Sequence, residues 1–489
     1  MPEKNLKQKA VSGVLWTTAQ RFSSIFIQFI SGIVLARLLL PEDYGCIGML
    51  SIFMLLASTF VDGGFGAALI QKKKPTQEDF STIFYWNVCL SIIIYLLLFF
   101  LAPIISEFYK MELLCPVLRI QGIVVVVNAF QVVQLAQLKK NFKFKKISIV
   151  TLLTSIISLS VTIIMAYQGF GVWSLVAQNI LMVLIPTIIY WTTNHWKPTF
   201  VFSKKSFKEL FDFGIFMFLT SLLSTLVNNI QGLLIGKMYS SSTMGYYSKA
   251  HSTEKLAATS LSQVISQVSY PLYAELQDDK DRLVGVIKKL TLSTAFMTFP
   301  LMLLLVLIAK PVFILLYSEK WTPAVPFFQI LCVAGLAICL QAVNSQAIAA
   351  VGKSKAMFSW SVVKQFTGLG FMLVGFFVFG MKGLLIGMVM KSWLIYLINA
   401  SLVSHFIGYK LARQLLDLLP ILLLALGSYL GTYYIASFIE CSIYINALIR
   451  IVVFGVVYFV GAAFTKLYAF TLCKDLLSPY LTKFLRMVK

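Results

Sequence analysis

The sequence predicts an all-α integral membrane protein with about fourteen transmembrane helices. Of its 489 residues, 59% are hydrophobic and only 12% are charged, and the mean hydropathy is +0.85. Soluble domains are about 25% charged. Apolar runs recur along almost the whole chain, and the length of each is close to that of a membrane-spanning helix, about 20 residues. The runs are too long and continuous for barrel strands, which have about ten residues of alternating polarity.

Fourteen apolar segments, separated by short polar clusters, give the expected spans in chain order. They are residues 12–36, 44–70, 80–102, 114–138, 147–167, 171–191, 207–236, 244–274, 287–308, 324–350, 356–379, 383–404, 415–437 and 443–465. The first segment contains Arg21 and is longer than a signal-peptide core, so we interpret it as a retained span.

The net charge of +22 comes from basic residues that alternate between loops. Counting Lys208, Lys288 and Lys289, at the very ends of their spans, with the adjacent loops, 28 of the 41 lysines and arginines fall in loops on one side, six on the other and seven deeper inside spans. This distribution argues against nucleic-acid binding, and by the positive-inside rule it places both termini in the cytoplasm. The seven cysteines are scattered without metal-ligand or disulfide spacing, so no metal site is expected.

A weak internal repeat relates the two halves of the chain. Residues 32–37 align with 232–237, and Gly45 then aligns with Gly245 at the same offset of 200. Later matches follow at slightly larger offsets, such as Gly171 with Gly383. Six spans separate the copies, so the repeat is parallel. We expect an N-lobe over residues 1–200 with spans 1–6 and a C-lobe over 201–405 with spans 7–12. Residues 406–489 would add spans 13 and 14 and a basic amphipathic cytoplasmic tail.

Seven basic residues lie inside the expected spans, away from the very ends of these segments. Charge at this depth is costly and usually faces a bundle interior or a wet cavity. Asp62 and Glu254 are the comparably deep acids. The surplus of cations indicates an anionic ligand that passes through the protein. The seven are Arg21, Arg119, Lys249, Lys255, Lys364, Lys391 and Arg450.

Spans 1, 7 and 8 are unusually polar. Span 8 is the most polar of all, and spans 1 and 7 carry related polar faces at repeat-equivalent positions, which predicts that the three line one cavity. The candidate binding residues are Arg21, Gln28, Asp62, Asn228, Lys249, His251, Glu254, Lys255, Lys364 and Lys391. An arginine offers bidentate geometry for a phosphate, whereas a lysine acts as a point charge.

Structural interpretations of several of these residues stay open. Arg21 either contacts the ligand or forms an ion pair with Asp62. Lys364 and Lys391 either face the cavity or join neighbouring helices, and His251 is either a proton-coupling group or an interfacial histidine. Arg119 and Arg450 lie near span ends, where the length of the side chain allows snorkelling to the interface.

Three sequence blocks carry a family resemblance. They are ARLLLPEDYG at residues 36–45, DGGFGAALIQ at 62–71 and EKWTPAVP at 319–326. Together they resemble the polysaccharide transporter branch of the MOP flippase superfamily, close to Wzx-type and colanic-acid-type lipopolysaccharide biosynthesis exporters. The resemblance implies a two-lobed, MATE-like carrier that moves undecaprenyl-pyrophosphate-linked oligosaccharide from the inner to the outer leaflet of a bacterial cytoplasmic membrane. It implies no cofactor and leaves coupling to an H⁺ or Na⁺ gradient open.

The same resemblance implies partners and competing functions. Membrane lipids and the polymerase and glycosyltransferases of the pathway are the expected partners. Related flippases use basic residues on spans 1, 2 and 8, but span 2 here offers Asp62 instead. A carrier of lipid II or a teichoic-type lipid and a multidrug exporter are the nearer alternatives. A membrane glycosyltransferase or polymerase is not expected, because the connections are short and the chain has no acidic metal-binding motif.

Overall fold

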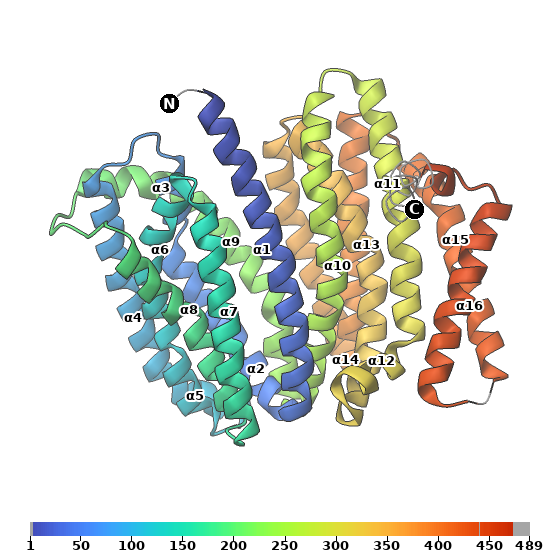
Figure 1. The fold of residues 1–489 in the computed structure, drawn as a ribbon, viewed down its shortest axis with the longest axis horizontal. Coiled ribbons are helices and arrows are strands. Elements are labelled where there is room, and N and C mark those ends of the chain that lie inside the picture. Colours follow the sequence, from blue (N-terminus) through green and yellow to red (C-terminus); the bar gives the residue numbers. More distant parts are fainter. Residues whose placement is uncertain (1–2, 440, 473–489) are drawn as a thin grey trace, which may run out of the picture. The chain divides into compact units, whose positions relative to one another are not determined.

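The computed structural model describes residues 3–439 and 441–472, and these residues are almost entirely helical, with no strand among them (Figure 1). The all-α prediction is therefore confirmed for the described chain. In a bilayer each backbone N–H and C=O must find a partner inside the protein, which a helix provides within its own segment.

Contacts divide the chain into two compact units, Met1–Ser248 and Lys249–Lys489. The division into lobes at residue 200 rests on the repeat and stays a prediction, because the first unit also contains the helix that corresponds to span 7. That helix packs on α2, α3 and α4. The first unit comprises α1 (Glu3–Leu38), α2 (Pro41–Asp62), α3 (Phe65–Gln71), α4 (Gln77–Tyr109), α5 (Leu114–Gln121), α6 (Ile123–Lys140), α7 (Phe144–Tyr167), α8 (Val172–Thr193), α9 (Lys204–Met238) and the beginning of α10 (Ser241–Glu275).

The second unit contains the remainder of α10 and the helices that follow it. Within it, α13 packs on α11 and α14, and α15 joins α11 to α16. The connection between expected spans 9 and 10, predicted to be a loop, forms α12 and a 3₁₀ turn. The elements are α11 (Lys280–Leu307), α12 (Ala309–Tyr317), η1 (Glu319–Ala324), α13 (Val325–Ala350), α14 (Ser354–Phe406), α15 (Leu411–Ser437) and α16 (Ile443–Phe464).

Twelve helical segments of the described chain are long and apolar enough to cross a membrane. One of them, within α14, is two helices joined at Gly380, whose φ of 61° is left-handed. The 35-residue α10 matches the expected span 8, but it is not among the twelve. The chain is a multi-pass membrane protein, and the count of fourteen spans stays a prediction.

Two glycines interrupt the second expected span. Gly63 ends α2 with a φ of 49°, and Gly64 begins α3 with a φ of 74°. A Cβ atom on Gly64 would lie 2.7 Å from the carbonyl oxygen of Gly214 in α9. Glycine is therefore required here both for the left-handed backbone and for the close approach of α9. The interruption leaves Asp62 at the last position of α2.

Candidate functional site

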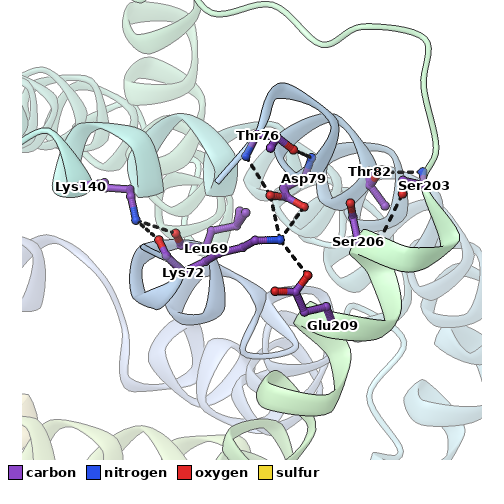
Figure 2. Close-up of polar contacts among 9 residues, drawn as sticks. All are labelled: Leu69, Lys72, Thr76, Asp79, Thr82, Lys140, Ser203, Ser206 and Glu209. Carbon is purple, nitrogen blue, oxygen red and sulfur yellow. Dashed lines mark hydrogen bonds and ion pairs between the residues drawn. The ribbon is translucent and has the colours of Figure 1, made fainter. Parts of the chain in front are cut away.

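The first unit contains an ion-pair network at the ends of α3, α4 and α9. Figure 2 shows Lys72 between two carboxylates: its Nζ lies 3.0 Å from Asp79 Oδ2 and 2.9 Å from Glu209 Oε2. The Asp79 side chain is 1% exposed and that of Glu209 is 58% exposed. Asp79 also accepts a hydrogen bond from the backbone N–H of Thr76, whose hydroxyl accepts one from the N–H of Asp79. This reciprocal capping box begins α4.

The other hydrogen bonds of Figure 2 hold neighbouring backbone. Lys140 donates to the carbonyl oxygens of Leu69 and Lys72 at the end of α3. Ser203 donates its N–H to Thr82 Oγ1 and caps α9 by accepting from the N–H of Ser206. The start of α9 is thereby tied to α4. These residues have a structural role in the first unit.

A cavity of about 360 Å³ with a mixed polar and apolar lining lies elsewhere in the first unit, between the α2–α3 segment and α6. Asp62 lines it from the end of α2, and Asn128, Gln131 and Lys139 line it from α6. Among the described residues, none of these four side chains has a hydrogen bond or an ion pair within 4 Å. The cavity therefore presents a carboxylate, two amides and an ammonium: Asp62 and Lys139 are exposed, and Asn128 and Gln131 are half-buried.

The other sequence-predicted residues of the first unit lie outside this cavity. Arg21 in α1 is half-buried and has no hydrogen bond or ion pair with any described residue. In particular, it does not pair with Asp62, so the structure does not contain the Arg21–Asp62 ion pair that the sequence left open. Gln28 in α1 and Asn228 in α9 are exposed.

The second unit contains Lys249, which is 4% exposed. Its Nζ lies 4.1 Å from the centre of the Tyr317 ring and 5.8 Å from that of Trp321. Aromatic rings attract a cation through their quadrupole, and the attraction is stronger where water is excluded. The sequence grouped Lys249 with ligand-binding cations, but the structure places it against α12 and η1.

Glu254 is buried beside α13. It is 3% exposed, and its Oε1 accepts no hydrogen bond from the described residues. A Cβ atom on Gly335 would lie 3.2 Å from this oxygen, so the absence of a side chain at Gly335 makes room for the carboxyl group. The neighbouring Lys255 is exposed and His251 is half-buried. Adjacent positions of α10 thus point to different surroundings.

Lys364 and Lys391 lie in the two helices of α14. Lys364 Nζ donates to Asn399 Oδ1 at 2.5 Å, which joins the helices on either side of Gly380. The side chain of Lys391 covers Gly368, where an added Cβ would lie 2.6 Å from its Cγ. For Lys364 the structure supports the interpretation as a link between neighbouring helices.

The two arginines expected to snorkel have protein partners. Arg119 Nε donates to the carbonyl oxygen of Phe99 at 3.3 Å, and its guanidinium lies 4.3 Å from the centre of the Phe99 ring. Arg450 Nη1 donates at 2.9 Å to the carbonyl oxygen of Leu307, the last residue of α11. A cation at this position satisfies a carbonyl that the helix leaves unpaired. Both arginines therefore stabilise helix contacts.

Sequence reasoning missed Asn128, Gln131 and Lys139. Their spacing of three and eight residues places them on one face of α6, which was a detectable signal. It also missed the Lys72 network, although Thr76 followed by Asp79 before an apolar run is a capping-box pattern. Glu209 could not have been found, because it lies 137 residues from Lys72.

The fold and its intramembrane polar residues define a helical membrane protein of the transporter type. Comparison with known proteins gives the family: the chain belongs to the polysaccharide biosynthesis protein family, whose model matches residues 34–326. The resemblance found in the sequence to the polysaccharide transporter branch of the MOP superfamily is thus confirmed.

Two curated relatives align with most of the chain. The teichuronic acid biosynthesis protein TuaB of Bacillus subtilis (strain 168) is 24% identical over 358 residues, which cover 73% of this chain and 74% of TuaB. The lipopolysaccharide biosynthesis protein WzxC of Escherichia coli (strain K12) is 24% identical over 412 residues, which cover 83% of this chain and 82% of WzxC.

A solved structure shares the fold. The lipid II flippase MurJ superposes on this chain with a TM-score of 0.74 at 15% identity, covering 93% of this chain and 99% of MurJ. At this identity the similarity concerns the fold alone. It confirms the MOP-like architecture that the sequence predicted.

Proposed function

We propose that this chain is a flippase that moves an undecaprenyl-pyrophosphate-linked oligosaccharide from the inner to the outer leaflet of a bacterial cytoplasmic membrane by alternating access. The main support for this function is the family match over residues 34–326. In addition, the fold matches that of a lipid flippase along nearly the whole length of the chain. The relatives TuaB and WzxC, named for teichuronic acid and lipopolysaccharide biosynthesis, support a glycan as cargo.

The distribution of charge supports an anionic lipid. Arg21 is half-buried in α1, and no described residue uses its guanidinium. A guanidinium binds phosphate through two parallel hydrogen bonds, so Arg21 is our candidate for the pyrophosphate contact. Lys255 is exposed and is the candidate for a second contact. Lys249 lies against the Tyr317 ring, and Lys364 donates to Asn399.

Transport by this proposal needs no catalytic residue. Among the described residues, no cluster of three or more His, Cys, Asp and Glu side chains could hold a metal ion. The loops between the described helices are short. The proposed partners are membrane lipids and the enzymes that build and polymerise the glycan. In this proposal both termini lie in the cytoplasm, and an H⁺ or Na⁺ gradient supplies the energy.

A carrier of a teichuronic-acid-type or other cell-wall lipid is the second candidate, and the TuaB alignment is the observation that favours it. The hypothesis that the chain carries lipid II is supported only by the similarity of its fold to that of MurJ. No specific observation favours a multidrug exporter.

Deletion of the gene tests the proposal in cells. The lipid-linked oligosaccharide should accumulate in the inner leaflet, where membrane-impermeant periodate oxidises it in inverted vesicles and not in spheroplasts. The mass of the accumulated lipid distinguishes an oligosaccharide carrier from a teichoic-type or lipid II carrier. Equal oxidation in spheroplasts of deleted and parental cells would contradict the proposal.

A further inference from the structure

The cavity of the first unit differs in charge from a site for pyrophosphate. Its charged lining consists of the Asp62 carboxylate and the Lys139 ammonium, which cancel formally. A pyrophosphate held here would approach a carboxylate, and a simple cation would approach an ammonium. Like charges in contact are unfavourable, so neither ion suits the whole lining. A neutral ligand meets no such penalty.

The polar groups of the cavity offer both donors and acceptors. The Asp62 carboxylate only accepts, the Lys139 ammonium only donates, and the amides of Asn128 and Gln131 do both. No described residue forms a hydrogen bond with any of the four side chains. A ligand that carries many hydroxyl groups, each able to donate and to accept, complements this mixture.

The position and size of the cavity agree with a ligand taken up from one side of the membrane. From Lys139 to Asn128 the polar face of α6 runs for about 16 Å along the helix axis. Lys139 lies in the last turn of α6, at the start of the basic segment 139–146 that the charge distribution assigns to the cytoplasm. The volume of about 360 Å³ falls within the range of small-molecule sites, about 300–1,000 Å³.

We infer that this cavity is a carbohydrate subsite, in which Asp62, Asn128, Gln131 and Lys139 bind hydroxyl groups of the glycan. The inference rests on the proposed function and separates two tasks within it. Arg21 binds the charged diphosphate, and the cavity binds the neutral sugars.

Binding of two lipids by the purified full chain tests the inference. The probes are undecaprenyl pyrophosphate and the same lipid bearing the oligosaccharide, extracted from cells that produce it. Asn128→Leu and Gln131→Leu remove amides without changing charge. Gln137→Leu is the matched control, because Gln137 lies on α6 outside the cavity lining. Thermal melting verifies that each variant is folded.

The double variant should bind the glycan-bearing lipid about tenfold more weakly, as expected for the loss of two hydrogen bonds. Its affinity for undecaprenyl pyrophosphate should stay within about twofold, and Gln137→Leu should change neither affinity. Equal weakening for both lipids, or no weakening for either, would overturn the subsite and leave the flippase proposal standing. Failure of the unmodified chain to bind either lipid would overturn both.

Discussion

Gly45 and Gly245 bring two helix backbones into contact at one crossing of the first unit. A Cβ atom on Gly45 would lie 1.9 Å from the carbonyl oxygen of Ser241, and one on Gly245 would lie 1.8 Å from that of Pro41. The contacts are reciprocal, because Gly45 and Gly245, like Pro41 and Ser241, are 200 residues apart. This is the offset of the internal repeat, so equivalent positions of the two copies meet each other.

Replacement of either glycine at the crossing should strongly destabilise the fold. A Cβ atom cannot lie within 2 Å of a backbone oxygen, so Gly45→Ala or Gly245→Ala must separate the helices. We expect each to lower stability by more than about 3 kcal/mol. Gly427→Ala is the control, because nothing lies within 4 Å of its added Cβ. Size-exclusion chromatography and thermal melting in detergent would check this, and a normal melting temperature for Gly45→Ala would contradict the crossing.

The two carboxylates that contact Lys72 should contribute unequally to stability. Lys72→Met strands the buried Asp79 and should cost about 1–3 kcal/mol. Glu209→Gln removes an exposed partner and should cost less than about 0.5 kcal/mol. Adding Asp79→Asn to Lys72→Met should recover part of the loss in a double-mutant cycle. Thermal unfolding of the four proteins provides the measurement, and equal costs for Lys72→Met and Glu209→Gln would refute the assignment.

The Lys72 network should weaken only in alkali. Partial burial lowers the pKa of Lys72, but its hydrogen bonds with Glu209 and Asp79 outweigh burial, so the pKa is raised above 10.5. A raised lysine pKa stabilises the folded state below the unfolded pKa, and this contribution is lost as pH rises through the folded pKa. The stability difference between the parent and Lys72→Met should be constant from about pH 7 to 9 and should shrink above about pH 10.5. A difference that shrinks between about pH 7 and 9 would be inconsistent with this.

Lys249 and Lys255 should respond differently to removal of their charge. Lys249 is buried against Tyr317 and Trp321, and an apolar side chain of similar length can often replace a buried ion without loss of stability. Lys249→Met should therefore retain folding and transport. Lys255→Met should reduce transport at least about fivefold, because an exposed cation that contacts a phosphate contributes about 1 kcal/mol or more. The reverse order of transport losses would reject these roles.

Much of the fold could be predicted because the membrane leaves few choices. Apolar segments must be helical, and every described α-helix except α12 overlaps an expected segment, as α7 does with residues 147–167. The helical α12 and η1 lie outside the apolar runs that carry this signal. The division of packing at Ser248 was also not predictable, because it depends on contacts of α9 that no local pattern encodes.

The candidate site was harder to predict because depth alone does not give the direction of a side chain. Lys249 and Lys255 both lie in the same expected span, yet one meets Tyr317, 68 residues away, and the other is exposed. Asp62 was identified from its depth. Its neighbours Asn128 and Gln131 were missed because uncharged amides in a span produce a weaker signal than a lysine.

Transport by purified protein in liposomes tests the flippase proposal most directly. The full chain would be reconstituted with a radiolabelled undecaprenyl-pyrophosphate-linked oligosaccharide, and its exposure to a membrane-impermeant glycosidase would be followed over time. We predict rapid exposure of the inner pool with the parent chain and at least about tenfold slower exposure with a folded Arg21→Ala variant, which lacks a bidentate phosphate contact. Equal exposure rates in liposomes with and without the parent chain would contradict the proposed function.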